Sequence, residues 1–417
     1  MKHFLLTLSV SFAMLMACNS SSETKNFAEV GAQQNNFVLL ELNQKQTDIL
    51  KLNNQFAIEL SQKIDSASIK TNWFASPLSA SFALAMATNG AAESTQNELK
   101  SVLGFSKYSI EEFNEFYNIV LNYLLQADKK TTIGIANSVW TANDLEPKKL
   151  FVKNCQQHFN AVVENIDFNK KESVDLINSW CAEKTDNCIE KMYDKLNGDT
   201  KMLILNALYF KGEWSTPFNK KSTMTEPFTN QDGSIVKTSM MNLMSAHFNY
   251  LESDQFAMAE FPYGNGNFSF VAIVANGSFN IDNIMSNLTA TRFDSLINSM
   301  SITELNVKMP KFKIEKEFNL NNALMSMGIN EAFSTNANFS NIADKELFIS
   351  EVKQKAFINV DESGTEAAAV TGIGVRVTSL HEPIVKHFYL NKPFAFFIIE
   401  RNSGAILFTG KINQGEF

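Results

Sequence analysis

Hydrophobic residues recur at helical spacing through much of the first half of the chain. Between residues 46 and 66 they fall three or four positions apart, which predicts an amphipathic helix. Ser76 and Pro77 form a strong helix start, because serine caps free backbone N–H groups and proline fits the first turn. Ser109 and Glu112 have the spacing of a capping box. The predicted helices are 46–66, 77–89, 109–125, 147–163 and 172–185.

Strand patterns dominate the second half of the chain. Strands are predicted at 131–141, 202–211, 256–262, 268–275, 303–314, 348–361, 394–400 and 405–411. Asn265 and Gly266 predict a hairpin turn between two of them. Thr95 and Glu98 also have the spacing of a capping box. Helices followed by antiparallel strands favour an α+β fold over a doubly wound one.

The first eighteen residues have the layout of a secretory signal. Lys2 precedes an apolar run, 4–16, which is too short to span a membrane. The ending Leu15-Met16-Ala17-Cys18 resembles a bacterial lipobox, which implies removal of 1–17 and lipidation of Cys18. An ordinary signal peptide with an incidental cysteine is the alternative. We expect an anchor and tether at 18–44 and a single domain at 45–417, because no linker or repeat divides the latter.

Composition and charge exclude several classes of function. The chain has 417 residues, 36 basic and 44 acidic side chains and a net charge of −8, so no basic surface for nucleic acid is expected. The cysteines and histidines lack the spacing of metal ligands, and neither a metal nor a cofactor is predicted. Beyond Cys18 the count is odd, so at most one internal disulfide can form. Cys181 and Cys188 are the nearest pair in sequence, and idle thiols are equally consistent.

The motifs of common enzymes are absent from the sequence. No Gly-x-Ser-x-Gly elbow, His-Glu-x-x-His pair or phosphate-binding glycine loop occurs. The histidines at 158, 247, 381 and 387 have no acidic or metal-binding partner close by in sequence. We therefore predict a protein that is not an enzyme.

Residues 362–393 form an unusual segment. They are rich in small residues and contain Gly372 and Gly374, which is typical of a mobile connection. They also alternate with period two, and the charged residues Glu366 and Arg376 share one face. The opposite face carries small or apolar uncharged residues, namely Thr365, Ala367, Ala369, Thr371, Ile373, Val375 and Val377. The segment therefore combines the properties of a loop with those of a half-buried strand.

This segment and its flanks resemble the serpins, a family of protease inhibitors. Motifs of the family follow in order at Asn72-Trp73-Phe74-Ala75-Ser76-Pro77-Leu78-Ser79, Asn206-Ala207-Leu208-Tyr209-Phe210-Lys211-Gly212-Glu213-Trp214, Glu260-Phe261-Pro262-Tyr263, Met309-Pro310-Lys311-Phe312, Met327-Gly328-Ile329 and Asn391-Lys392-Pro393-Phe394. The resemblance covers about 45–413. Several long motifs in the right order make it specific.

The resemblance implies three β-sheets surrounded by eight or nine helices, with an exposed reactive-centre loop at about 362–390. It implies a suicide inhibitor, in which a protease cuts the loop and the cut loop inserts into the central sheet while the acyl-enzyme persists. The positions that match the family's hinge are Glu362, Gly364, Thr365, Glu366, Ala367, Ala368 and Ala369. An uncharged Thr365 fits the inhibitory pattern, because a buried unpaired charge would oppose insertion.

Other matched positions lie in the body. Ser76, Ser79 and Asn206 match a buried polar cluster, the shutter, in which Gln354 replaces the family's usual histidine. Glutamine both donates and accepts hydrogen bonds, so it can satisfy this cluster. Three further residues match the place where the loop enters the sheet, the breach. They are Trp214, Lys311 and Glu362.

The family's usual spacing of seventeen residues from Glu362 implies cleavage between Thr378 and Ser379. A small residue at 378 suits elastase-like or subtilisin-like proteases. Cleavage between Arg376 and Val377 is the alternative and would suit trypsin-like enzymes. Papain-like cysteine proteases are further candidate targets.

Two other functions stay open at this stage. One is a non-inhibitory serpin that acts as a surface binding protein, and the other is an adhesin or carrier that only uses the fold. The expected protein is a monomer that binds proteases but no nucleic acid. We expect it in the bacterial cell envelope, lipid-anchored to the outer membrane and facing either the periplasm or the medium.

Overall fold

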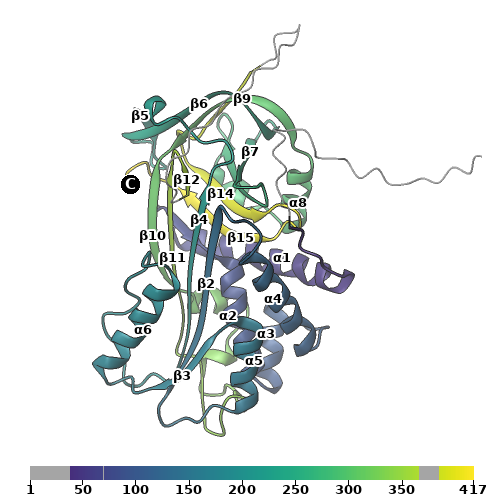
Figure 1. Ribbon diagram of the computed structural model, residues 1–417, viewed down its shortest axis with the longest axis vertical. Coiled ribbons are helices and arrows are strands. Elements are labelled where there is room, and N and C mark those ends of the chain that lie inside the picture. Colours follow the sequence, from purple (N-terminus) through teal and green to yellow (C-terminus); the bar gives the residue numbers. More distant parts are fainter. Residues whose placement is uncertain (1–37, 69, 366–384) are drawn as a thin grey trace, which may run out of the picture. The chain divides into compact units, whose positions relative to one another are not determined.

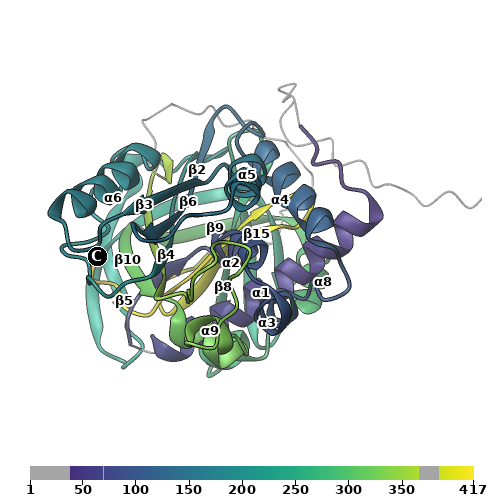
Figure 2. The same cartoon turned by 90° about the horizontal axis from the view of Figure 1, so that it is seen from below.

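The computed structural model describes residues 38–68, 70–365 and 385–417, and Figures 1 and 2 show its elements. They fall within one unit, Phe37–Phe417, which is held together by its own internal contacts. The predicted signal sequence at 1–17, the predicted lipidation site Cys18 and most of the predicted reactive-centre loop lie outside the described residues.

Nine α-helices lie within these ranges. They are α1 (Gln44–Ala67), α2 (Pro77–Gly90), α3 (Glu93–Val102), α4 (Ile110–Leu124), α5 (Lys149–Phe159), α6 (Lys171–Lys184), α7 (Ile281–Ser286), α8 (Ala290–Asn298) and α9 (Asn321–Met327). The Ser76 hydroxyl caps α2 by accepting from the backbone N–H of Ser79 at 3.2 Å. Ser109 and Glu112 form both hydrogen bonds of the capping box on α4. Both predicted helix starts are confirmed.

The first β-sheet, here called the central sheet, has six strands in the described ranges. Their order is β10 (Phe312–Asn319), β11 (Glu351–Asp361), β12 (Gly364–Thr365), β4 (Met202–Glu213), β2 (Thr131–Ala142) and β3 (Val162–Ile166). The strand β11 is antiparallel to β10 but parallel to β4. Figure 1 shows α6 beside the lower half of these long strands and β5 and β6 at their upper ends.

The other two sheets share a long strand and so form one hydrogen-bonded network of nine strands. The second sheet contains β1 (Trp73–Ala75), β15 (Ile406–Ile412), β14 (Phe394–Glu400), β8 (Phe268–Ala275), β7 (Phe256–Tyr263) and the end of β6 (Ile235–Glu252). The third contains β5 (Met224–Thr229), the start of β6, β9 (Ser301–Pro310) and β13 (Lys386–Tyr389). A register shift between Leu243 and Ala246 marks the bulge where β6 passes from one sheet to the other. The predicted α+β fold with three sheets and eight or nine helices is confirmed, with nine helices in the described part of the chain.

The helix α2 lies in the interior. All fourteen of its residues are buried, because it packs against β4 of the central sheet on one side and β15 of the second sheet on the other. A helix that is apolar all round is typical of such a position. Its N-terminal serines therefore face the middle of the central sheet.

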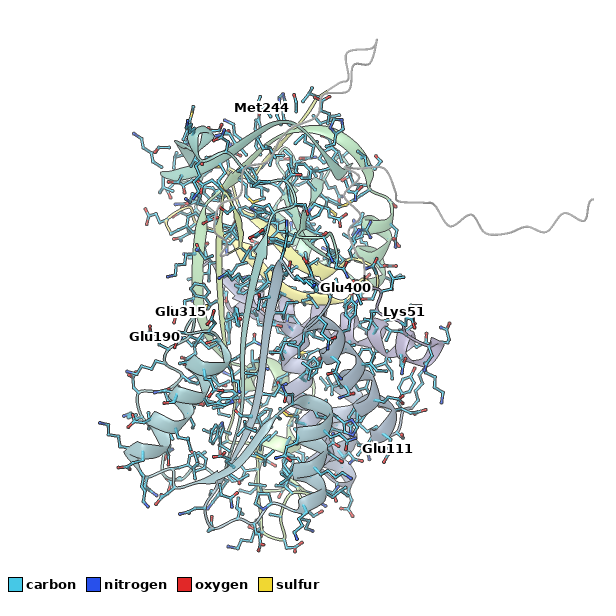
Figure 3. The ribbon with its side chains drawn as sticks, in the orientation of Figure 1. Lys51, Glu111, Glu190, Met244, Glu315 and Glu400 are labelled. Atoms are coloured by element: carbon cyan, nitrogen blue, oxygen red, sulfur yellow. The ribbon has the colours of Figure 1, made fainter. Side chains whose placement is uncertain are left out.

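Buried charges in the second sheet are satisfied locally. Glu400, labelled in Figure 3, is fully buried and accepts hydrogen bonds from the backbone N–H groups of Asn402 and Ser403 and from the Tyr123 hydroxyl. Lys411 is also buried and pairs with Asp65 and Asp282. Glu400 thus has several hydrogen-bond donors and Lys411 has two carboxylate partners, so neither charge is buried without partners.

Three local predictions are wrong in detail. The helix predicted at 147–163 ends at Phe159, because Asn160 takes a left-handed conformation with φ +48° and β3 follows. The strand predicted at 303–314 divides at Lys311 into β9 and β10. The capping box of Thr95 and Glu98 does not form, since α3 begins two residues before Thr95.

The carboxylate of Glu98 has another role. It accepts hydrogen bonds from the backbone N–H groups of Asn330 and Glu331. The Thr95 hydroxyl in turn donates to the Glu331 carboxylate. Thr95 and Glu98 therefore connect α3 to the short 3₁₀ turn Glu331–Phe333 instead of capping the start of α3.

Two of the cysteines are buried in the body. Cys155 and Cys181 are free thiols, so no disulfide joins Cys181 to Cys188 in this structure.

In the described part of the chain, none of the helices has both the length and the apolar character that crossing a bilayer requires.

Candidate functional site

The central sheet opens at one end to admit the start of the predicted hinge. The strands β11 and β4 pair directly from Glu351 opposite Leu203 to Phe357 opposite Tyr209. Above that point they separate, and the two residues of β12 lie between them. Thr365 pairs with Val360 of β11 and with Gly212 of β4, antiparallel to both. The hinge is therefore already seated as a short strand.

A tight turn connects β11 to β12, and Trp214 holds it. The backbone N–H of Trp214 donates to the Ser363 carbonyl at 2.9 Å, and its indole N–H donates to the Asp361 carbonyl at 2.9 Å. The Asp361 carboxylate accepts from the backbone N–H of Ser363 at 2.7 Å. Because Trp214 bonds both sides of the turn, it fixes the direction in which the chain re-enters the sheet.

Glu362, at the tip of this turn, is buried and doubly bonded. Its carboxylate accepts from Lys311 Nζ at 2.8 Å and from the Thr223 hydroxyl at 2.7 Å. Burial by itself would raise the pKa of Glu362, but the hydrogen bonds from Lys311 and Thr223, together with the charge of Lys311 and a backbone hydrogen bond, hold the pKa below its usual range. Glu362 therefore stays ionised and joins the turn to the third sheet through Thr223.

Gly364 is required by the geometry of the seated strand. Its φ is +149°, and a Cβ there would lie 2.0 Å from the Gly212 carbonyl oxygen. Any other residue would clash with the backbone of β4. The close approach of the hinge to β4 therefore depends on this glycine.

Thr365 is fully buried and its hydroxyl is paired. The distance from Thr365 Oγ1 to the Tyr263 hydroxyl oxygen is 2.7 Å. The Tyr263 ring lies flat against Trp214, with ring centroids 4.4 Å apart and planes 11° from parallel. Burial raises the pKa of Tyr263, so its hydroxyl stays protonated and able to donate.

The predicted shutter lies nearer the start of β11, about seven residues before the turn that Trp214 holds. At the usual rise of a strand this places it roughly 23 Å from that turn. Gln354 accepts from the backbone N–H of Ser76 at 2.9 Å and donates to the Ser76 carbonyl at 2.8 Å. The Ser76 hydroxyl donates to the Leu407 carbonyl at 2.6 Å. Gln354 is buried, and its amide satisfies one backbone donor and one acceptor at the start of α2.

The other half of the shutter lies on β4 and β2. The Ser79 hydroxyl donates to the Asn206 side-chain oxygen, and the Asn206 amide donates to the Asn137 side-chain oxygen at 2.7 Å. Asn206 is opposite Gln354 in the parallel register. The four predicted shutter residues therefore come together, with Asn137 as an additional member.

The structure places the candidate residues in two clusters. The breach contains Trp214, Lys311, Glu362, Gly364 and Thr365. The shutter contains Ser76, Ser79, Asn206 and Gln354. The predicted positions Glu366, Ala367, Ala368, Ala369, Arg376, Val377, Thr378 and Ser379 lie outside the described residues.

Sequence reasoning missed several partners of these residues. Thr223 and Asn137 have no signal in the sequence, because each contacts a partner that is distant along the chain. Tyr263 stands in a motif that the sequence analysis quoted, but without a role. Gly212 carries a signal of its own, since a glycine inside a strand often marks a close approach.

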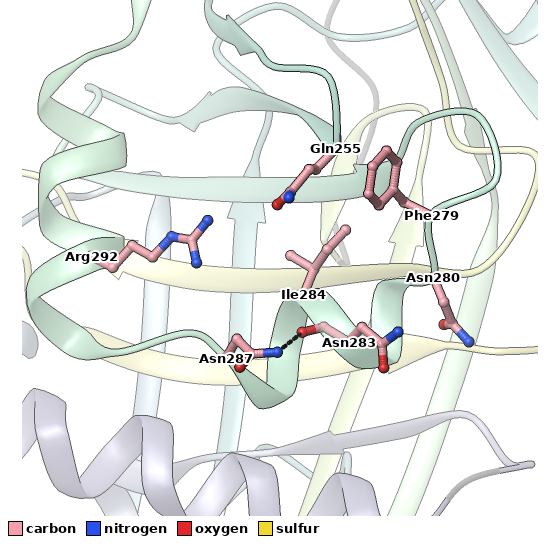
Figure 4. A pocket seen from close by; sticks show the side chains of 7 residues that line it. All are labelled: Gln255, Phe279, Asn280, Asn283, Ile284, Asn287 and Arg292. Carbon is pink, nitrogen blue, oxygen red and sulfur yellow. Dashed lines mark hydrogen bonds between the residues drawn. The ribbon is translucent and has the colours of Figure 1, made fainter.

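A separate pocket of about 360 Å³ lies away from both clusters. Figure 4 shows that its side chains come from α7, from Asn287 directly after α7, from Arg292 of α8 and from the segments before β7 and α7. Its lining consists of Gln255, Phe279, Asn280, Asn283, Ile284, Asn287 and Arg292. In the described ranges, no group of three or more His, Cys, Asp or Glu side chains is arranged to hold a metal ion.

Comparisons with known proteins give a consistent result. The family model described as "Serpin (serine protease inhibitor)" matches residues 51–415. Iripin-2 of Ixodes ricinus is 32% identical over 378 residues, which are 89% of this chain and 94% of that protein. The native crystal structure of a thermophilic serpin, tengpin, is 33% identical with a TM-score of 0.81 and covers 90% of this chain and 95% of its own. Thyroxine-binding globulin in complex with thyroxine is 25% identical with a TM-score of 0.80, over 89% of this chain and 100% of its own.

Replacing Gln354 with alanine tests the shutter. The Gln354→Ala change leaves the buried backbone N–H of Ser76 without a partner and its carbonyl with only the helix bond from Ala80, so we expect the free energy of unfolding to fall by about 1–3 kcal/mol. Denaturant unfolding of the native state measures this change. The exposed Gln55→Ala variant serves as the control. A loss below about 0.5 kcal/mol, the range of ordinary surface substitutions, would contradict the role of Gln354.

The pKa of Glu362 predicts a pH dependence. Because its pKa in the folded protein lies below the ordinary value of 4.5, ionised Glu362 stabilises the native state. This contribution is complete above the pKa of the unfolded chain and is lost as the pH falls through the folded-state value. The thermal midpoints of wild type and Glu362→Gln should therefore differ most near neutral pH and converge in acid. Glu146→Gln, at an exposed position, provides the control. A difference that stays constant down to acid pH would contradict this assignment.

Proposed function

The chain belongs to the serpin family, whose members are in general protease inhibitors, and we propose that it is a suicide inhibitor of serine endopeptidases. The observation that carries the proposal is the seating of Thr365 between β11 and β4. The start of an inserted strand is thereby in place before any cleavage. Position 365 carries no charged side chain that would oppose further insertion.

The proposed reaction begins with ordinary proteolysis. The protease serine attacks the carbonyl carbon of Thr378, the peptide bond to Ser379 breaks, and the amine of Ser379 leaves with a proton. Thr378 is then esterified to the protease. If the hinge inserts before water hydrolyses this ester, the protease is carried along with the loop and stays trapped.

The parallel ladder between β11 and β4 is the proposed place of insertion. Evenly spaced parallel pairs between Glu351 and Phe357 would be exchanged for antiparallel pairs on both sides of the new strand. At about 1 kcal/mol for each net hydrogen bond, a strand of a dozen residues contributes on the order of 10 kcal/mol. That free energy is sufficient to drive a change that is irreversible in practice.

The register of β12 fits the sequence of the loop. Extended residue by residue, the antiparallel pairing of Thr365 brings Thr371 between Gln354 and Asn206, which are now opposite each other. A threonine hydroxyl would there join the polar shutter. Residues 367 and 369, on the same face as Thr365, are alanines and fit a crowded interior.

The proposed scissile bond, Thr378–Ser379, suits elastase-like and subtilisin-like proteases. Cleavage at Arg376–Val377 would favour trypsin-like enzymes, and papain-like cysteine proteases remain candidates. The support is the count of residues from Glu362 and the chemistry of each side chain.

We also propose that the protein is a bacterial lipoprotein of the outer membrane. The support is the sequence ending at Cys18 and the polar stretch after it. Acyl chains on Cys18 would anchor the body through the tether predicted at 18–44. Detergent phase partitioning of wild type and Cys18→Ser tests this proposal, because only the lipidated form should enter the detergent phase. Equal partitioning of the two would refute it.

A protease panel tests the inhibitor proposal directly. The purified mature protein is incubated with elastase, trypsin, subtilisin and papain, and the products are separated on denaturing gels. We expect a heat- and SDS-stable complex with at least one serine protease. The mass of the released C-terminal peptide then decides between cleavage after Thr378 and after Arg376. Clean cleavage with full protease activity would instead support a non-inhibitory serpin that acts as a binding protein.

Arginine at 365 should convert the inhibitor into a substrate. The Thr365→Arg change places a long cation where the structure has a fully buried side chain, so insertion is opposed while cleavage is not. We expect the stoichiometry of inhibition to rise roughly tenfold or more. Thr225→Arg, at an exposed threonine of β5, is the matched control. Undiminished trapping by the Thr365→Arg variant would show that this position does not enter the sheet.

A further inference from the structure

The geometry points to Tyr263 as a positioning residue for loop insertion, an inference that rests on the proposed inhibitor function. We propose that its hydroxyl receives the Thr365 side chain and thereby keeps residues 364–365 docked as the first piece of the inserted strand. The docked piece makes the intact loop ready to insert once it is cut. Tyr263 itself belongs to the second sheet, so the docking joins two sheets.

The hydroxyl pair is enclosed on all sides. Both Tyr263 and Thr365 have no exposed surface, and their oxygens are 2.7 Å apart. Within the described residues, neither hydroxyl has another hydrogen-bond partner. The two hydroxyls therefore share one O–H···O hydrogen bond, and removing either group leaves the other buried without this partner.

The ring of Tyr263 is fixed by its surroundings. It stacks on Trp214 and packs edge-on against Phe210 at 4.9 Å between centroids. A Cβ on Gly212 would lie 2.9 Å from the ring, so this glycine makes room for the tyrosine beside β4. A rigid ring places its hydroxyl at one point, and that point determines how deep Thr365 lies.

The same contact determines the register in which the cleaved loop would insert between β11 and β4. Thr365 is opposite Val360 on one side and Gly212 on the other. A shift of one residue would turn the charged face of the loop inward, because side chains alternate along a strand. By binding residue 365 and no neighbour, Tyr263 selects the register in which small residues face the interior.

A double-mutant cycle tests the inference. The variants are Tyr263→Phe, Thr365→Val, the combination of both, and the conservative Thr365→Ser. Hydrogen exchange of the uncleaved protein measures the protection of the amides at 364 and 365 without any protease. We expect each single variant to lose protection roughly tenfold, because one buried hydroxyl is left unpaired. The free energy of protection lost in the double variant should be smaller than the sum of the losses in the two single variants. Thr365→Ser should retain most of the protection.

The same variants are then titrated against a protease that the wild type traps. Each single variant should show a severalfold higher stoichiometry of inhibition, with Thr365→Ser close to wild type. Tyr250→Phe, a buried tyrosine of β6 outside the breach, is the control and should change neither measurement.

The outcomes separate the two proposals. Unchanged protection in both single variants, or strictly additive losses in the double variant, would overturn the role of Tyr263. So would lost protection with an unchanged stoichiometry of inhibition. If the wild type traps no protease, the inhibitor proposal fails, while the exchange experiment still decides whether Tyr263 docks the hinge.

Discussion

The parallel ladder between β11 and β4 is the contact on which the rest of the structure depends. These two strands are neighbours along most of their length, yet they part at one end to hold Gly364 and Thr365. Each strand can therefore pair with the other or with a strand between them. A sheet with two discrete arrangements is a switch, because packed interiors change between states and do not deform gradually.

One polar cluster lies at the open end of this ladder and a second lies at its middle. At the open end, Glu362 is held by Lys311 and Thr223, and Trp214 bonds both sides of the turn. At the middle, Gln354 is bonded to Ser76 on α2. Buried hydrogen bonds of this kind are expensive to leave unmade, so both clusters resist the separation of β11 from β4. The proposed insertion would have to supply new partners for the groups that it disturbs.

Much of the architecture follows from local signals. The caps at Ser76 and Ser109 locate two helices, and alternating patterns locate the strands of the C-terminal hairpin. The long strand β6 has no such signal, since its burial changes where it passes from one sheet to another. The capping box at Thr95 was a false local signal, because Glu98 finds better partners on a distant turn.

The sequence by itself determined the order of motifs and the uncharged residue at 365, and its resemblance to the serpins indicated most of the polar residues of the two clusters. Such features depend on residue type and spacing, which the chain displays directly. Only the tertiary structure decided that Gln354 bonds both backbone groups of Ser76, and that Tyr263 meets Thr365. Those contacts join residues 278 and 102 positions apart. Their geometry comes from the stacking of sheets and helices, and no short-range pattern encodes it.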